Sequence, residues 1–195
     1  MSTDKKEQLI QAAIDLFSKH GFWNSSTASI AKHAKVATGT LFNYFPNKES
    51  LIDEVYLSIK ADLLNELSTT FAQITDPDDV KTVLEQLWYR YIHWSLEYPV
   101  KHDLLNQLKL SDLVSKEAKN IAMASFAEFH QHMMIWLNSG KLKPIKIEYF
   151  AEIFASQMQA CIDFGKDQQL KDMVLAKHIM LGFAVFWDGI KRKND

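Results

Sequence analysis

The sequence predicts an all-α protein of about nine helices, in which a small N-terminal helix-turn-helix domain is joined to a larger helical domain. Only six Gly and four Pro interrupt its 195 residues. No useful length of chain alternates apolar and polar side chains with the period of two that a half-buried strand shows. Residues 26–45 contain two short helical patterns separated by a tight turn, which is the arrangement of a helix-turn-helix.

The first expected helix runs from about Lys5 to His20 and ends at Gly21, because glycine accepts the left-handed backbone that commonly closes a helix. The second is short and begins at Ser26 or Thr27, where a hydroxyl can accept hydrogen bonds from the first-turn amides. Its narrow apolar stripe consists of Ile30, Ala31 and Ala34.

The chain then turns at Lys35–Val36, and another short helix is expected from about Thr38 to Phe45. Leu41 and Phe45 are one helical turn apart and therefore point into the same core. The opposite face carries hydroxyl, amide and phenol groups, which suit hydrogen bonds to the base edges and phosphates of DNA. These outward residues are Thr38, Thr40, Asn43 and Tyr44.

A long helix is expected from about Lys48 to Phe71, capped by Asn47 and apolar at every fourth position from Leu51 to Leu67. Because it begins beside the helix-turn-helix and ends in the larger domain, we expect it to connect the two. We place the domains at 1–47 and 48–195. The remaining helices are expected at about 78–97, 99–110, 112–138, 147–164 and 168–191, with Asp76–Asp79 and Asp112 as caps and with Pro99, Gly140, Pro144 and Gly165 as breaks.

Apolar, glycine and polar residues recur at fixed offsets through residues 7–57. The matching positions are Ile10, Ala12, Ala13, Leu16, Phe17, Gly21, Phe22, Thr27, Ile30, Ala31, Val36, Gly39, Thr40, Leu41, Phe42, Tyr44, Phe45, Asn47, Lys48, Glu49 and Leu51. In this pattern the chain resembles the tetracycline-repressor (TetR) family of transcriptional regulators. The resemblance implies a DNA-binding pattern reaching about residue 64, a homodimer paired through the last two helices, and a small-molecule effector bound in the larger domain.

Three positions depart from the family pattern. Lys35 stands where glycine is common, Ala37 where a capping serine is common, and Phe42 where tyrosine is typical. A left-handed backbone at Lys35 would cost about 1 kcal/mol, and a missing cap costs about the same, ~1 kcal/mol. We expect Thr38 to take over the cap and to shift the start of its helix by one residue.

Side chains of the helix-turn-helix suggest individual DNA contacts. Asn43 can make paired hydrogen bonds to adenine, and Thr40 can contact a base or a thymine methyl group. Phe42 can pack on a sugar but cannot donate to a phosphate. From the resemblance, Thr27 and Tyr44 are expected on phosphates. The full predicted set is Thr27, Lys35, Thr38, Thr40, Phe42, Asn43, Tyr44 and Lys48.

The distribution of charge is compatible with this interpretation. The formal net charge is −2, but residues 1–50 carry six Lys against four acids, and the remainder is therefore at −4. A mildly basic head on an acidic body suits a protein that places one end on DNA.

Two further sets of residues are expected in the larger domain. Aromatic and Met side chains of its central helices can line an apolar effector pocket or can simply form core. The predicted effector set is Trp88, Tyr91, Trp94, Phe126, Phe129, His130 and Met133. The last two helices have apolar faces wider than one packing partner needs, so we expect a two-fold interface, with plain core as the alternative. The predicted interface set is Phe150, Phe154, Met158, Ile179, Phe183, Phe186 and Trp187.

Other functions find little support in the sequence. His130 and His132 diverge by about 200° on a helix and cannot share one ion, so we expect no metal and no cofactor. We find no phosphate-binding loop or nucleophile motif, and Cys161 is expected to be a buried apolar residue. Residues 1–8 are polar and the apolar run Ile179–Trp187 is short, so we expect a soluble, cytoplasmic protein.

The favoured hypothesis is a ligand-responsive repressor that binds a palindromic operator as a homodimer and is released by an apolar or aromatic effector. An all-helical enzyme or carrier that has lost DNA binding is the first alternative, which the departures at Lys35, Ala37 and Phe42 keep open. The second is an effector-free regulator whose aromatic body is solid core.

Overall fold

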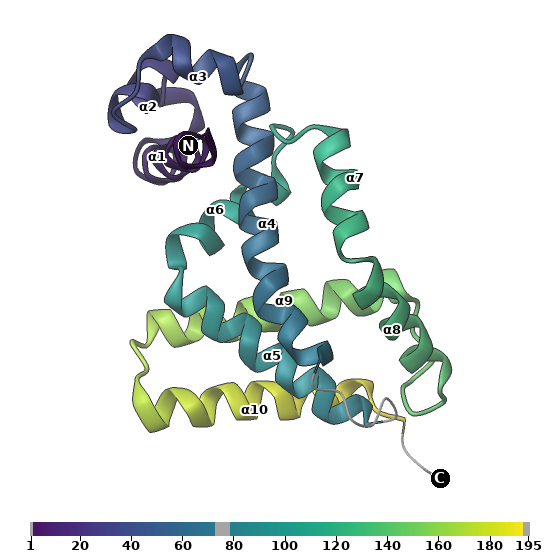
Figure 1. Ribbon diagram of the computed structural model, residues 1–195. Helices are drawn as coiled ribbons and strands as arrows, with labels where there is room; N and C mark the ends of the chain where they lie inside the picture. Colours follow the sequence, from purple (N-terminus) through teal and green to yellow (C-terminus); the bar gives the residue numbers. More distant parts are fainter. Residues whose placement is uncertain (1, 73–78, 193–195) are drawn as a thin grey trace. The chain divides into compact units, whose positions relative to one another are not determined.

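The computed structural model describes residues 2–72 and 79–192, and in them the chain forms ten helices (Figure 1). Within these ranges, Leu142 and Lys191 form one isolated antiparallel β-bridge. The helices are α1 (Ser2–Asn24), α2 (Thr27–His33), α3 (Thr38–Tyr44), α4 (Lys48–Ala72), α5 (Val80–Glu97), α6 (Pro99–Leu110), α7 (Lys116–Ser125), α8 (Ala127–Asn138), α9 (Ile147–Asp167) and α10 (Asp172–Ile190). The predicted all-α class is therefore confirmed.

By packing, the chain divides into two compact units. The head unit comprises residues 1–63 and 98–125, and the body unit comprises residues 64–97 and 126–195. The chain passes from one unit to the other inside α4, between α5 and α6, and between α7 and α8. The domains predicted at 1–47 and 48–195 are defined by family pattern rather than by packing, and they stay a prediction.

In the head unit, α1 packs against α2 and α6. Gly21 has φ 77° and interrupts the helical backbone, which confirms the predicted break. Just beyond it the buried Ser25 hydroxyl donates to the carbonyl oxygens of Gly21 (2.8 Å) and Leu16 (3.1 Å). These bonds fix the path by which the chain leaves α1 and enters α2.

The beginning of α4 is capped as the sequence predicts, because the Ser50 amide donates to Asn47 Oδ1 at 2.8 Å. The predicted apolar stripe from Leu51 to Leu67 is buried. At the start of α5, the Thr82 amide donates to Asp79 Oδ1 at 3.1 Å, so Asp79 is the cap. The rest of the predicted loop, Asp76-Pro77-Asp78, lies outside the described residues.

The helix predicted from Asp112 to Asn138 is wrong in two respects. It is two helices, α7 and α8, because Phe126 leaves helical geometry with φ −97° and ψ 15°. The cap is also not Asp112, since the Ala118 amide donates to Ser115 Oγ at 3.1 Å. The Ser115 amide in turn donates to Asp53 Oδ1 on α4 at 2.8 Å, which holds the start of α7 within the head unit.

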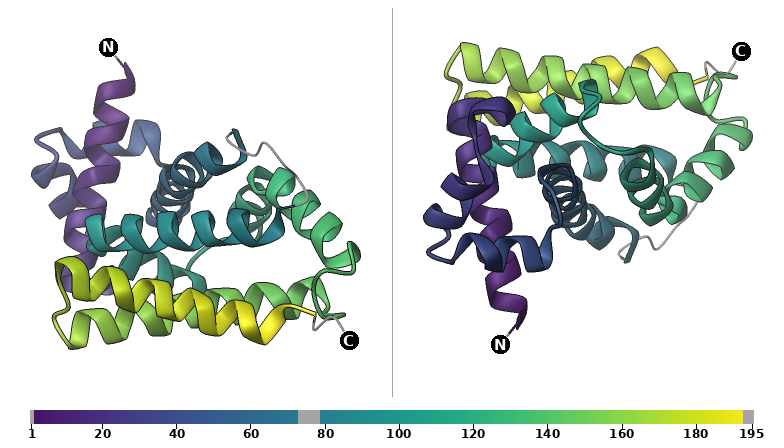
Figure 2. Two further views of the ribbon diagram at one scale, coloured as in Figure 1. Left: turned by 90° about the horizontal axis from the view of Figure 1, so that it is seen from below. Right: turned by 90° about the horizontal axis from the view of Figure 1, so that it is seen from above.

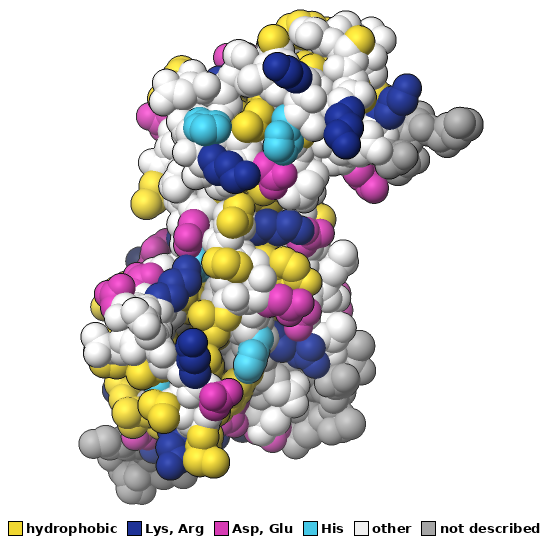
Figure 3. Space-filling model, turned by 90° about the vertical axis from the view of Figure 1, so that its left-hand side faces the viewer, with side chains coloured by type: hydrophobic (Ala, Val, Ile, Leu, Met, Phe, Trp, Pro, Cys, Tyr) yellow, Lys and Arg dark blue, Asp and Glu magenta, His cyan; other side chains and the backbone are white. Residues whose placement is uncertain are grey.

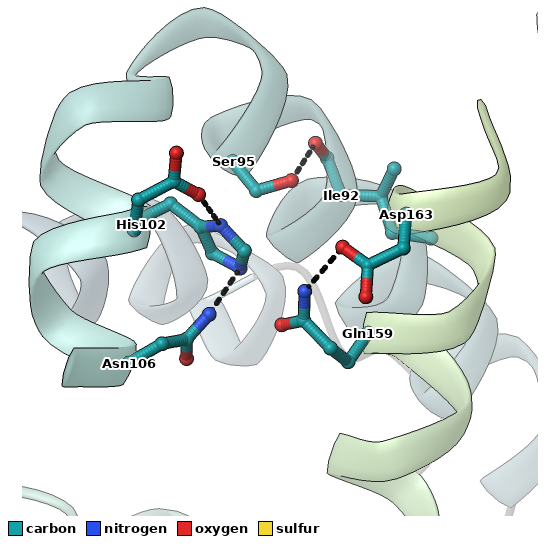
Figure 4. A network of polar contacts seen from close by, with 7 residues as sticks. Ile92, Ser95, His102, Asn106, Gln159 and Asp163 are labelled. Atoms are coloured by element: carbon teal, nitrogen blue, oxygen red, sulfur yellow. Dashed lines mark hydrogen bonds and ion pairs between the residues drawn. The ribbon is translucent and has the colours of Figure 1, made fainter. Parts of the chain in front are cut away.

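A fully buried histidine lies on α6. His102 Nδ1 is 3.3 Å from Asp103 Oδ1, and its Nε2 is 3.3 Å from Asn106 Nδ2 (Figure 4). Since both ring nitrogens have polar partners, the burial of this imidazole is compensated.

In the body unit, α9 and α10 lie side by side and both pack on α5 (Figure 2). Trp88 of α5 is fully buried between them, and its ring centroid lies 5.8 Å from that of Phe186 and 5.9 Å from that of Phe154. Its Nε1–H donates to the Ile179 carbonyl at 3.2 Å. A Cβ at Gly182 would lie 3.0 Å from the Trp88 ring, so glycine is what lets α10 approach it.

The predicted break at Gly165 is wrong. Gly165 is buried inside α9, where a Cβ would lie 3.5 Å from Leu175 of α10. The turn comes later, where Gln169 and Asp172 take φ values of 53° and 49°. Glycine at this position therefore does not end the helix, and a Cβ there would make only an ordinary van der Waals contact with Leu175.

Candidate nucleic-acid interface

The first helix of the motif, α2, is capped by Ser26, whose Oγ accepts from the Ser29 amide at 3.1 Å. Ile30 and Ala31 are fully buried, as the apolar stripe predicted. Because the cap and the stripe are both local features, they fix the start and the inward face of α2.

The turn after α2 depends on a strained residue. Lys35 has φ 56°, so the left-handed backbone considered at this position is present without the glycine that is common in the family. Its amide donates to the Lys32 carbonyl at 3.1 Å, and the Val36 amide donates to the Ala31 carbonyl at 3.0 Å. These two bonds close α2 as a left-handed C-terminal cap does.

The start of α3 has no side-chain cap. Ala37 occupies the cap position with an extended backbone and has no oxygen to offer. The prediction that Thr38 takes over the cap is wrong, because Thr38 is already the first helical residue. The backbone alone begins the helix, and the Thr40 amide donates to the Ala37 carbonyl at 2.9 Å.

The orientation of α3 is as predicted. Leu41 and Phe45 are buried, at 0% and 2% exposure. Thr38 and Asn43 are exposed, while Thr40 and Tyr44 are half-buried. Phe42 is 46% exposed and so presents an aromatic face next to the polar groups.

Gly39 also lies on this outward surface, and the sequence prediction missed it. It lacks the positive φ that would require glycine, and a Cβ built on it would meet nothing within 4 Å. Glycine within a helix is less stable than alanine by about 0.5–1 kcal/mol. Since the chain itself gives no reason for glycine here, the position is suited to close approach by an external molecule.

Two other predicted contact residues are only partly accessible. Thr27 is half-buried as the first residue of α2. The Lys48 ammonium donates to the Phe22 carbonyl and lies 6.0 Å from the centre of the Phe17 ring. Lys48 therefore already fastens α4 to α1, and a phosphate contact would have to share its ammonium with that bond.

Basic groups surround the motif. Lys19, Lys32 and Lys35 are exposed, and lysine and histidine side chains lie together on the upper part of Figure 3, over α1 and α2. Lys6 pairs with Glu54 at 2.6 Å, and His33 Nε2 lies 3.3 Å from Asp15 Oδ2. Not all of the basic charge is therefore free to meet an anion.

The seven predicted effector residues all belong to the body unit, but they differ in environment. Trp88, Trp94 and Met133 are buried as core. Tyr91 is half-buried, and burial raises the pKa of its phenol to about 12, so it stays neutral near pH 7. Phe126 and Phe129 are half-buried, whereas His130 is exposed.

The predicted interface residues lie mainly in the interior of the single chain. Six of the seven are buried within the single chain, and Trp187 is half-buried. They pack on α5 and on one another because that stripe faces the core. The buried residues are Phe150, Phe154, Met158, Ile179, Phe183 and Phe186.

The last two helices also expose apolar side chains, which lie on the outer faces of α9 and α10. On α10, Leu181 and Val185 are 63% and 59% exposed. The helix is 19 residues long, and an 18-residue stretch of it has a mean hydropathy of 1.4 and is only 22% buried, so by length and composition alone it could cross a membrane. We call this surface the outer apolar face; it consists of Tyr149, Phe164, Met173, Val174, Met180, Leu181 and Val185.

A capped helix, a left-handed turn and a second helix with an open polar face define the class of helix-turn-helix transcription regulators. The model of the family "Bacterial regulatory proteins, tetR family" matches residues 9–55. The chain belongs to this TetR family, and the resemblance inferred from its sequence is confirmed.

Curated relatives are also transcription regulators. Over 64 residues the chain is 39% identical to the HTH-type transcriptional regulator LuxR of Vibrio harveyi, a match covering 33% of this chain and 31% of that protein. It is 25% identical over 163 residues to the regulator RutR of Escherichia coli K12, covering 83% of this chain and 75% of RutR. The stronger similarity is thus confined to about a third of either chain.

Solved structures extend the similarity along the whole chain. A tetR family transcription regulator from Shewanella sp. PV-4 superposes with a TM-score of 0.80 at 27% identity, covering 97% of this chain and 99% of that one. A regulator of the same family from Marinobacter aquaeolei VT8 has a TM-score of 0.87 at 19% identity, covering 98% and 97%. The second likeness concerns the fold alone.

Proposed function

We propose that this regulator is a homodimeric repressor that binds a near-palindromic operator and is released by a small apolar or aromatic effector. The observation that carries the proposal is the outward face of α3, which is polar and accessible while its opposite face is locked in the core. Each subunit offers one such helix, and two of them would occupy successive major grooves about 34–36 Å apart.

Within that helix, Asn43 is our candidate for direct base recognition. It is exposed, and its amide can bond N6 and N7 of adenine together. Thr38 and Thr40 flank Gly39, where the missing side chain would let the backbone come close to the DNA. Phe42 would then rest on a sugar, since its ring is exposed and has no donor.

The phosphates on either side would be held by the remaining polar groups. Thr27 and Tyr44 supply hydroxyls, and Lys35 supplies an exposed ammonium at the strained turn. Lys48 would contribute only if its ammonium served both the Phe22 carbonyl and a phosphate. Such contacts position the motif but do not select sequence.

For the dimer we propose the outer apolar face in place of the residues predicted from sequence. Exposed apolar patches of this kind mark interfaces in soluble proteins. A two-fold pairing uses the same patch on both copies, and α9 and α10 of each would together make four helices. Leu181 and Val185 lie one helical turn apart on α10 and are the candidates for its centre.

We propose that the effector binds within the body unit, as the sequence predicted. Tyr91 and Trp94 of α5 have ring centroids 6.3 Å apart, and both Phe126 and Phe129 are half-buried on or next to α8. An effector that binds one arrangement of the body more tightly than another would shift the spacing of the two recognition helices. Its effect is limited by that difference in affinity.

An electrophoretic mobility shift with the gene's own upstream DNA tests the proposal. Replacing Asn43 and Tyr44 together by alanine should abolish specific binding while the circular dichroism of the protein stays unchanged. Unaltered binding by the double variant would show that α3 does not read DNA. Replacing the exposed Lys116 of α7 by alanine is the matched control, because it removes a charge elsewhere in the head unit.

A second candidate, an effector-free regulator, is favoured by one observation. Trp88, Trp94 and Met133 are packed as core and offer little surface to a ligand. A thermal-shift screen of apolar and aromatic compounds separates the two candidates, because a ligand that binds the folded state raises its melting temperature. A compound that raises the melting temperature and weakens the shifted DNA band supports the ligand-responsive form.

A further inference from the structure

The end of α1 carries an aromatic pair with opposite environments. Phe22 is buried, and its ring is tilted against that of Phe17 at a centroid distance of 5.0 Å. The next residue, Trp23, is 83% exposed. Phe22 therefore anchors this segment, while the large apolar ring of Trp23 is directed into solvent, where it adds little to the stability of the fold.

An open surface hollow of about 600 Å³ is lined by residues that are close to Trp23 in sequence. It is lined by Leu16, Lys19, His20 and Asn24 of α1 and by Ser29 of α2. Trp23 does not line the hollow itself, but in sequence it falls between His20 and Asn24, which both do. Lys19 and His20 are exposed, so the hollow carries a cation and an imidazole at its margin.

The hollow borders the helix-turn-helix, because one of its lining residues, Ser29, lies in the first turn of α2. A DNA backbone lying against the start of α2 would therefore be near the side chains that line the hollow on α1. An ammonium can neutralise a phosphate and an imidazole N–H can donate to one, while an indole can pack on deoxyribose and donate through Nε1.

We propose that Trp23, Lys19 and His20 form a second DNA contact, which grips the sugar–phosphate backbone outside the base pairs read by α3. This inference rests on the proposed function, since it assumes that α3 is on the DNA. It assigns a role to three residues outside the predicted DNA-binding set. The contact adds affinity and not sequence preference, because it touches no base edge.

Tryptophan fluorescence tests the contact directly. Trp88, Trp94 and Trp136 are buried and Trp187 is half-buried, so Trp23 should dominate the emission that acrylamide can quench. Adding a duplex of the gene's own upstream region should protect that emission in the wild type. In Trp23→Phe, the quenching should already be small and should change little on adding DNA.

Affinity measurements provide the second readout. Trp23→Ala should weaken binding of that duplex by about three- to tenfold, as loss of a contributing interface aromatic does. Lys19→Ala should lower the slope of log K against log salt by about one, because one phosphate contact is lost. Lys116→Ala, which removes an exposed lysine of α7, should leave affinity and slope unchanged.

The outcomes separate this inference from the proposed function. If the duplex binds but Trp23 remains fully quenchable, and Trp23→Ala and Lys19→Ala bind normally, the second contact does not exist and Trp23 is free to serve a protein partner. If the wild type binds no duplex at all, the proposed function itself fails. Protection of Trp23 together with weaker binding by both variants supports the contact.

Discussion

Two helices, α3 and α10, both bury one face and expose the other, but the exposed faces differ in chemistry. Outward from α3 lie Thr38, Gly39 and Asn43, which are small or polar. Outward from α10 lie Met180, Leu181 and Val185, which are apolar. The comparison supports the proposal that the head unit meets a polar, charged surface and the body unit an apolar one.

The inner faces differ as well. α3 is only seven residues long and depends on Leu41 and Phe45 to hold it. α10 is held by the aromatic cluster around Trp88, which also fixes Phe183 at 6.0 Å between ring centroids. We therefore expect changes at the body core to act on stability, and changes on α3 to act on binding.

The largest expected effect is at the body core. Trp88→Ala should lower the free energy of unfolding by about 3–5 kcal/mol, because it empties a fully buried aromatic site and removes the indole hydrogen bond to the Ile179 carbonyl. Urea denaturation followed by circular dichroism measures this. Trp23→Ala is the matched control and should change stability by less than about 0.5 kcal/mol, since that side chain is exposed. Equal losses in the two variants would contradict the assigned core.

The next effect concerns the outer apolar face. Replacing Leu181 and Val185 together by lysine should convert a dimer into a folded monomer, because two exposed positions gain charges that cannot be buried against a second copy. Sedimentation velocity measures the mass, and circular dichroism checks the fold. Replacing the exposed Lys146, which precedes α9, by glutamate is a suitable control. A variant that stays dimeric would place the interface elsewhere.

A smaller and opposite pair of effects is expected at Gly39. Gly39→Ala should stabilise the head by about 0.5–1 kcal/mol, because it favours the helix and meets no neighbour. The same methyl group should weaken DNA binding if the backbone approaches the duplex at that point. Gly189→Ala in α10, which also meets nothing within 4 Å, is the control. It should stabilise the protein similarly and leave DNA binding intact.

The smallest effect is a pH dependence at the start of α5. Hydrogen bonds from the side chain and then the backbone of Thr82 lower the pKa of the Asp79 carboxyl. A lowered folded-state pKa means that the stabilisation is present above about pH 4, the unfolded value, and is lost as the pH falls through the folded pKa. Asp79→Ala should cost about 0.5–1 kcal/mol at pH 7 and should remove this part of the acid sensitivity. Thermal melts at a series of pH values, from roughly pH 7 down to roughly pH 2.5, measure both the loss at pH 7 and the acid sensitivity.

Much of the head was predictable because its signals are local. The cap at Ser26, the left-handed turn at Lys35 and the inward pair Leu41 and Phe45 each depend on residues a few positions apart. The error at Thr38 is also instructive. The sequence lacked a capping side chain at Ala37, and the helix formed at its expected place without one because tertiary packing of α3 outweighs a cap worth about 1 kcal/mol.

The body was less predictable, because the apolar pattern of its helices does not show which face of each helix points to the core. α10 is apolar on nearly every side, so its pattern could not tell whether Phe183 or Leu181 faced the core. The aromatic cluster decided it, since Phe183 and Phe186 reach Trp88 while Leu181 and Val185 do not lie on that side. In the same way, Gly182 marks close packing of α10 on Trp88 and Gly165 lies inside α9, and a linear pattern cannot distinguish either position from a helix break.

By itself the sequence determined the helical class, the helix-turn-helix and the family, because caps, turn residues and one-sided apolar stripes act over a few residues. Only the tertiary structure decided which face of α10 belongs to the core. It also decided that the helix breaks at Phe126 and that the Trp23 side chain is exposed. Those outcomes depend on which distant side chains fill the same space, and close packing of an interior admits one arrangement where an apolar pattern admits several.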